Sequence, residues 1–189
     1  IKTTNIVYAI SHNGGVSSGL VIGGSPSTSN TINVQRSAPS SNFVFGTYST
    51  DNTSNPTSYD ISYNNITLSN LSGNSLGMGI YNYEGNAATP KTFNNNTISI
   101  SGTNIGVSNG LYLSNGNITA SNNSINVNTG SLSITGIDFT VNGSVSQALV
   151  DSNSITLASS ADSVIARGIG TSLTTIVNGF TITNNTINS

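Results

Sequence analysis

Asn123-Ser124-Ile125-Asn126-Val127 is one copy of a five-residue pattern that recurs along this chain: asparagine, any residue, isoleucine, any residue, aliphatic. Five further copies keep the same offset, although the last one ends in Ser189. The asparagines are Asn30, Asn64, Asn96, Asn123, Asn153 and Asn185, and the isoleucines are Ile32, Ile66, Ile98, Ile125, Ile155 and Ile187. Successive isoleucines are 27 to 34 residues apart. A repeat of this length predicts structural units that stack on one another.

Two short strands on either side of a tight bend account for the pattern. In the last five copies, the residue five before the isoleucine is apolar: Ile61, Phe93, Ala120, Val150 and Ile182. Alternate residues of a strand point the same way, so the bend must shift the phase by one residue. Asparagine tolerates the left-handed conformation that such a shift requires. We therefore expect the repeated asparagines to occupy that conformation and to donate their amides to one another as a ladder. The isoleucines should stack in the core.

A second motif, glycine followed by an aliphatic residue, lies about midway between the copies. Its copies are Gly19-Leu20, Gly79-Ile80, Gly110-Leu111, Gly136-Ile137 and Gly168-Ile169, and Asn42-Phe43-Val44-Phe45 takes its place in the second unit. We interpret this motif as a third strand. The inward pairs would be Leu20 with Ile22, Leu111 with Leu113, and Ile137 with Phe139.

Three strands per 27 to 34 residues predict an all-β parallel solenoid of about six coils. Helical repeats are excluded because they need amphipathic segments, which the chain lacks. A β-propeller is excluded because each blade needs four strands in about 40–45 residues. Antiparallel hairpins would not return the same asparagine at the same phase. We expect a single domain over residues 1–189, or a segment of a longer solenoid, with an irregular first coil at 1–19 and a loop insertion at 49–60.

The composition excludes several classes of protein. The 189 residues include 33 Ser, 30 Asn, 24 Thr and 20 Gly, which together disfavour helices. Four basic residues and a net charge of −2 argue against nucleic-acid binding. The hydrophobic fraction of 34% is too high for a disordered chain. There is no cysteine, and no apolar run reaches the roughly 18 residues that a membrane-spanning helix needs.

The Asn-x-Ile-x-aliphatic repeat, preceded by an apolar strand, resembles the right-handed parallel β-helix of the pectate-lyase-like superfamily. This resemblance covers about residues 20–189 and implies the same asparagine ladder at the bend between two strands. The superfamily includes lyases, hydrolases, tailspikes and adhesins, so the resemblance is specific for fold and weak for function. The amino-acid composition, rich in Asn, Ser, Thr, Gly and Ile, looks most like that of the passenger or stalk regions of large secreted bacterial adhesins. It implies an extracellular or cell-surface location.

Catalytic chemistry finds little support. A glycoside hydrolase needs two carboxylates about 5–10 Å apart, and equivalent residues on adjacent coils would lie about 4.8 Å apart. The residues equivalent to the acids are not acids: Tyr112 and Gly170 for Asp138, Ser121 and Thr183 for Asp151, and Thr92 for Asp60. His12 lies in a sequence typical of a turn, so we expect an exposed loop histidine. We expect no catalytic residue, cofactor or metal.

One outward track is of more interest. Val21, Val44, Tyr81, Tyr112 and Asp138 should follow one another on successive coils, with Tyr83 beside Tyr81. Exposed aromatic rings can stack on sugars, so Tyr81, Tyr83, Tyr112 and Asp138 are candidate glycan contacts. Alternatively, the tyrosines stack on one another as neighbours in a sheet do, or lie under a loop.

The resulting expectation is a non-enzymatic structural or adhesive protein that presents a binding face to glycans or to another surface protein. Two alternatives stay open: a fragment of a polysaccharide-active lyase or hydrolase, and a subunit of a self-assembling extracellular filament. No amphipathic capping helix is visible in the sequence, and uncapped solenoids expose strand edges. The ends could therefore be continued, covered by another chain, or joined end to end.

Overall fold

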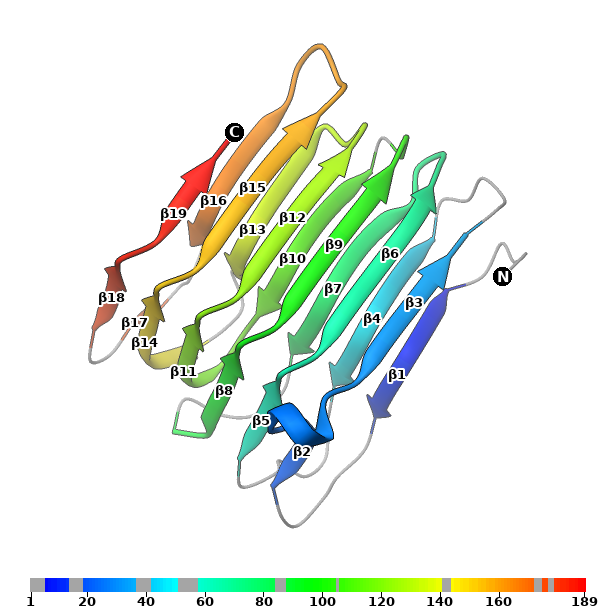
Figure 1. Ribbon diagram of the computed structural model, residues 1–189. Helices are drawn as coiled ribbons and strands as arrows, with labels where there is room; N and C mark the ends of the chain where they lie inside the picture. Colours follow the sequence, from blue (N-terminus) through cyan, green and yellow to red (C-terminus); the bar gives the residue numbers. More distant parts are fainter. Residues whose placement is uncertain are drawn as a thin grey trace.

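The computed structural model describes residues 6–13, 19–36, 42–50, 58–83, 88–104, 106–140, 144–171, 175–176 and 179–189. Their strands form three parallel sheets that extend along one axis (Figure 1). Sheet A contains β1 (Val7–Asn13), β4 (Phe43–Thr50), β7 (Leu76–Tyr83), β10 (Val107–Leu113), β13 (Ser133–Phe139) and β16 (Ile165–Thr171). Sheet B contains β2 (Leu20–Gly23), β5 (Tyr59–Ser62), β8 (Pro90–Asn94), β11 (Gly116–Ser121), β14 (Ser144–Asp151), β17 (Thr175–Ile176) and β18 (Phe180–Thr183). Sheet C contains β3 (Thr31–Gln35), β6 (Asn65–Leu71), β9 (Thr97–Gly102), β12 (Ser124–Thr129), β15 (Ser154–Ser159) and β19 (Thr186–Asn188).

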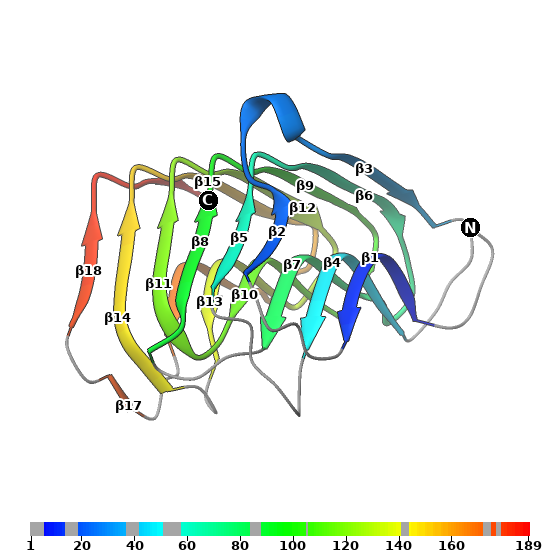
Figure 2. The same ribbon diagram turned by 90° about the horizontal axis from the view of Figure 1, so that it is seen from below.

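The chain passes through sheets A, B and C in turn, and each strand pairs in parallel with its counterpart in the next coil. This topology is a parallel β-helix of six coils with three strands each, which confirms the predicted fold class. In the last coil sheet B is divided between β17 and β18, which both pair with β14. Figure 2 shows the strands of sheet B side by side, from β2 through β5, β8 and β11 to β14 and β18. The 3₁₀ helix η1 (Pro26–Thr28) projects away from the sheets. The described residues include no helix that is long and apolar enough to span a membrane.

The repeated isoleucines pair directly with one another along sheet C, from Ile32 in β3 to Ile187 in β19. The first five are buried, because the polar turns leave only the inward positions of each strand to apolar residues. Ile125 is 1% exposed, whereas Ile187, in the last coil, is 48% exposed. Burial of each inward aliphatic side chain contributes roughly 1.5–3 kcal/mol relative to an exposed one. The core is therefore a set of single files along the axis.

The six repeated asparagines are linked by side-chain hydrogen bonds. In the first five, Nδ2 donates to the Oδ1 of the asparagine in the next coil, at 2.8–3.1 Å. From Asn64 onward, each Nδ2 also donates to a carbonyl of the preceding coil, such as that of Phe93 for Asn123. Asn64, Asn96, Asn123 and Asn153 are buried. These side chains satisfy carbonyls near the ends of the sheet B strands that would otherwise lack a donor.

The left-handed conformation lies one residue earlier than the sequence indicates. At these bends the positive φ angles belong to Tyr63, Asn95, Asn122, Ser152 and Asn184, each immediately before a ladder asparagine. The expectation that the ladder asparagine itself is left-handed is therefore wrong. The physical reason is that the preceding residue turns the backbone, and this turn directs the asparagine side chain into the core.

The glycine motif is the packing partner of the isoleucine motif. A Cβ added to Gly46, Gly79, Gly110, Gly136 or Gly168 would lie 2.4–2.6 Å from Cγ2 of an isoleucine in sheet C. The partners are Ile66, Ile98, Ile125, Ile155 and Ile187 in the same order. Real Cβ atoms do not come so close, so each coil needs glycine in sheet A wherever sheet C supplies the repeated isoleucine. The alternation of sheet A strands is broken at these glycines: a Cβ on Gly79 would point at Ile98 in the core, and the adjacent Ile80 also belongs to the core.

The first two coils differ from the expectation. Gly19-Leu20 belongs to sheet B, where Leu20 pairs with Tyr59, and not to the glycine file of sheet A. The first strand of sheet A is β1, whose Tyr8 and Ile10 pair with Phe45 and Thr47. In the second coil Gly46-Thr47 occupies the glycine–aliphatic position, and its polar threonine hid it from the pattern.

The expected irregular first coil at 1–19 and the expected insertion at 49–60 lie largely outside the described residues. Residues 1–5, 14–18 and 51–57 are not described. In between, β1 forms a regular seven-residue strand, β4 ends at Thr50, and β5 begins at Tyr59.

Candidate functional site on the outer face of sheet A

The outer face of sheet A consists of two files of side chains that change character along the axis. One file is Tyr8, Phe45, Met78, Asn109, Thr135 and Arg167, of which the four middle members are at most 5% exposed. The other is Ser11, Tyr48, Tyr81, Tyr112, Asp138 and Gly170. Both files are mainly apolar or aromatic in the first coils and polar in the last two. We call the two parts the aromatic end and the polar end of this face.

Three tyrosines of the second file form a continuous stack. The ring centroids of Tyr48 and Tyr81 are 5.1 Å apart, and those of Tyr81 and Tyr112 are 5.0 Å apart, with planes within 9° of parallel. Tyr83 lies beside Tyr81 at 6.3 Å. The alternative in which the tyrosines stack on one another is therefore confirmed. Both faces of the Tyr81 ring are covered by its neighbours, so a ligand can meet only the edge and the hydroxyl of this residue.

The stack also perturbs the hydroxyl of Tyr81. Burial raises the pKa of Tyr81 far above its usual value, and the neighbouring hydroxyls of Tyr112, Tyr48 and Tyr83 raise it further. Tyr81 therefore stays neutral, and its hydroxyl can act as donor or acceptor over the whole physiological pH range.

The predicted track was wrong in its first two members. Val44 is fully buried in the core, and Val21 lies in sheet B, where its side chain is 62% exposed. Their places in the file belong to Tyr48 and Ser11. The misplacement follows from aligning residues 42–45 with the glycine motif, when Gly46-Thr47 is the true equivalent. Sequence reasoning therefore missed Tyr48, which continues the stack.

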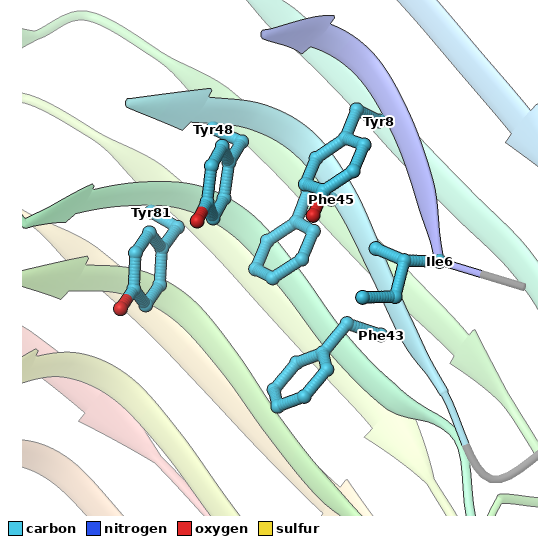
Figure 3. Close-up of a pocket in the computed structure, with 6 residues that line it drawn as sticks. All are labelled: Ile6, Tyr8, Phe43, Phe45, Tyr48 and Tyr81. Carbon is cyan, nitrogen blue, oxygen red and sulfur yellow. The ribbon is translucent and has the colours of Figure 1, made fainter. Parts of the chain in front are cut away.

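The aromatic end contains a shallow hollow of about 150 Å³, lined by Ile6, Tyr8, Phe43, Phe45, Tyr48 and Tyr81 (Figure 3). Tyr8 and Phe45 stack with their ring centroids 5.3 Å apart, and Phe43 stacks on Phe45 at 5.4 Å. Ile6 and Tyr8 are 42% and 41% exposed, so part of this lining faces solvent. Burial, and then the nearby Tyr48, raise the pKa of Tyr8 above its usual value.

The polar end contains a second hollow, of about 180 Å³, lined by Asp138, Arg167, Gly170 and Thr171. Asn109 Nδ2 approaches Asp138 Oδ2 at 3.4 Å. The Tyr112 hydroxyl donates to Thr140 Oγ1 at 2.7 Å, which fixes the last ring of the stack. Burial raises the pKa of the Asp138 carboxyl, and the positive charge of Arg167 partly opposes this shift. A desolvated carboxylate beside a cation at the surface is a feature typical of functional sites.

The acids have the coil neighbours that the repeat predicts. Asp138 pairs with Tyr112 and Gly170, Asp151 with Ser121 and Thr183, and Asp60 with Val21 and Thr92. Among the residues with assigned positions, no three His, Cys, Asp or Glu side chains gather as they would around a metal. Asp51 and Glu84 lie outside this part of the chain.

His12 is not in a turn, contrary to the expectation. It lies in β1, where it pairs with Ser49 of β4. The adjacent Asn13-Gly14-Gly15 gave the turn signal, but the strand persists to Asn13.

Lys91 is buried, which the sequence did not indicate. Lys91 is 1% exposed, and its Nζ donates to the Ser114 carbonyl at 2.7 Å and to Asn82 Oδ1. Nζ also lies 5.0 Å from the centroid of the Tyr59 ring, within reach of a cation–π interaction. This buried ammonium group joins sheets A and B inside the rod and takes no part in the outer face.

Comparison with known proteins gives no relative for this chain: no protein-family model, no curated protein and no solved structure matches it.

Proposed function

We propose that this chain is a non-enzymatic structural and adhesive rod, secreted or displayed on a bacterial cell surface, whose sheet A binds carbohydrate. The observation that carries the proposal is the outer face itself, where an aromatic hollow and a polar hollow lie along one sheet. Sugars combine apolar ring faces with many hydroxyls, and a surface with both kinds of group is complementary to them. Glycans of several units could extend along the axis from one hollow to the other.

The Asn ladder and the files of core side chains support the structural part of the proposal. The chain has 10 charged residues and no cysteine. Few of its stabilising contacts can therefore change with pH or redox state, as suits a protein exposed outside the cell.

A glycan array tests the binding proposal. Tyr112→Ala removes the end of the tyrosine stack together with its hydroxyl, and Tyr81→Ala interrupts the stack in the middle. We expect either variant to lower binding by about tenfold, or about 1.4 kcal/mol, because Tyr112→Ala removes an aromatic ring at the end of the stack and Tyr81→Ala removes a ring edge and hydroxyl and leaves its two neighbours unsupported. Tyr63→Ala is the matched control, because Tyr63 lies at the turn between β5 of sheet B and β6 of sheet C and does not belong to sheet A. Unchanged glycan binding by both stack variants would remove the proposal.

A further inference from the structure

The tyrosine file ends in a hollow, because its last position is a glycine. Tyr48, Tyr81 and Tyr112 are followed by Asp138 and then by Gly170. A Cβ added at Gly170 would lie 3.3 Å from Asp138 Oδ1 and 3.3 Å from Arg167 Cδ. The floor of the polar hollow is therefore bare backbone, and a side chain at this position would fill it.

Nothing in the backbone requires glycine at this position. Gly170 is not among the glycines with positive φ, and a Cβ there would meet its neighbours at 3.3–3.4 Å, which they can accommodate with small shifts. In contrast, the glycine file of sheet A leaves no room for a Cβ beside the isoleucines. Gly170 differs from those glycines in that it opens a space next to a carboxylate and a guanidinium group.

The groups around this space determine which ligand it suits. The Asp138 carboxylate accepts hydrogen bonds, the Arg167 guanidinium donates them, and the Thr171 hydroxyl can do either. Their charges cancel, so an acidic sugar would gain from Arg167 what it loses to Asp138. A neutral sugar with two adjacent hydroxyls can donate from one to Asp138 and accept at the other from Arg167. Charge-assisted hydrogen bonds of this kind are the stronger ones.

The surroundings of Asp138 agree with such a role. Asn109, which is 1% exposed, donates from Nδ2 to Asp138 Oδ2, and its Oδ1 has no hydrogen-bond partner among the described residues. Within this part of the chain the Asp138 carboxylate accepts one long hydrogen bond of 3.4 Å, so it keeps accepting capacity for a ligand. Its raised pKa indicates that the fold desolvates this charge without fully compensating it.

We propose that the hollow of Asp138, Arg167, Gly170 and Thr171 is a subsite for one neutral pyranose ring with adjacent hydroxyls. At about 180 Å³ it is smaller than the sites of about 300–1,000 Å³ that hold drug-sized ligands, which fits a single ring. This inference rests on the proposed carbohydrate-binding function and adds the place and the chemical class of the sugar. The tyrosine stack would contact the neighbouring units of the same glycan.

The test combines an array of neutral and uronic-acid oligosaccharides with titration calorimetry on the strongest neutral binder. Gly170→Val fills the hollow, and Asp138→Asn keeps its shape but removes the anionic acceptor. We expect each variant to lower the affinity for the neutral glycan by about tenfold, the loss of roughly one charge-assisted hydrogen bond. Ala158→Val is the matched control, because Ala158 is exposed on sheet C and the same bulk is added there. Gly170→Ala, a smaller change, replaces Gly170→Val if circular dichroism shows that the valine variant does not fold.

Each outcome bears on a different claim. Loss of binding with Gly170→Val and Asp138→Asn but not with Ala158→Val supports the subsite. Full affinity in both variants, together with loss in Tyr81→Ala and Tyr112→Ala, overturns the subsite and leaves the proposed function standing. A preference for uronic-acid glycans also overturns it. No binding of any glycan by the parent protein refutes both proposals.

Discussion

Asn123 illustrates how single residues hold this rod together. Its Oδ1 accepts from the backbone N and from Nδ2 of Asn96, and its Nδ2 donates to the Phe93 carbonyl and to Asn153 Oδ1. One buried side chain thus links three successive coils. Water cannot replace these partners at a position that is 1% exposed.

Asn123→Ala should therefore lower the free energy of unfolding by about 3 kcal/mol, because several buried donors and acceptors lose their partner at once. Asn126→Ala is the control, since Asn126 is exposed in the same strand and should change stability by no more than about 0.5 kcal/mol. Urea denaturation of both variants measures the difference. Equal midpoints would contradict a stabilising role for the ladder.

Two acids should make stability depend on pH in opposite directions. The pKa of Asp138 is raised in the folded state, mainly by burial, so folding takes up protons and stability falls as the pH rises through this pKa. The pKa of Asp151 is lowered by hydrogen bonds from Thr183, Asn184 and Ser152. Its contribution is present above the unfolded pKa of about 3.9 and is lost as the pH falls through the folded pKa.

Melting temperatures between about pH 3 and pH 7 test this contrast. The melting temperature of Asp138→Asn should rise relative to that of the parent protein as the pH rises, because the variant lacks the desolvated charge. The melting temperature of Asp151→Asn should fall relative to that of the parent protein over the same pH range. Parallel curves for the two variants would show that the surroundings of these carboxyls have been misjudged.

At the scale of elements, the two sequence motifs act as one packing unit. The glycine of sheet A and the isoleucine of sheet C meet across the core in every coil from the second onward. The break in side-chain alternation at this glycine also determines which residues of sheet A face outward. It therefore places Tyr48, Tyr81 and Tyr112 in one file. Core packing on the inside therefore determines the candidate binding face on the outside.

Gly110→Ala should destabilise the protein by about 1–3 kcal/mol, the usual effect of overpacking a core. Its Cβ would lie 2.4 Å from Ile125 Cγ2 and 2.6 Å from the carbonyl oxygen of Gly136, which is part of the backbone and cannot move aside cheaply. Gly170→Ala in the same sheet is the control, with nearest contacts at 3.3 Å. Thermal melts should separate the two variants by several degrees, and coinciding melts would mean that the coil has room to expand.

At the scale of the whole molecule, the rod is a row of coils that depend on their neighbours. Each coil contacts mainly the one before and the one after, so stability is a sum of coil and interface contributions. Interior coils are covered on both sides, whereas the last coil leaves Ile182 and Ile187 about half exposed. The effect of a substitution should thus depend on the coil in which it is made.

Ile125→Asp should unfold the rod, because it places a charge without a partner at a site that is 1% exposed between two coils. Ile98→Asp should act in the same way. Ile187→Asp occupies the same file in the last coil, at 48% exposure, and should leave most of the coils folded. Circular dichroism and limited proteolysis would distinguish these results, and equal resistance of all three variants would count against a stacked core.

The sequence by itself determined the coil. Asparagine and isoleucine return at one offset because stacked strands put equivalent residues about 4.8 Å apart, so a column of contacts in space is a period in the sequence. The same period gave correct coil neighbours for Asp138 and Asp151. Only the tertiary structure decided the phase of the first two coils of sheet A, because Gly46 is followed by threonine where later coils have an aliphatic residue, and its role is visible only against the Ile66 methyl group across the core. For that reason Tyr48, the buried Lys91 and the hollow at Gly170 emerge only when the coils are assembled: each is defined by neighbours from other coils or sheets.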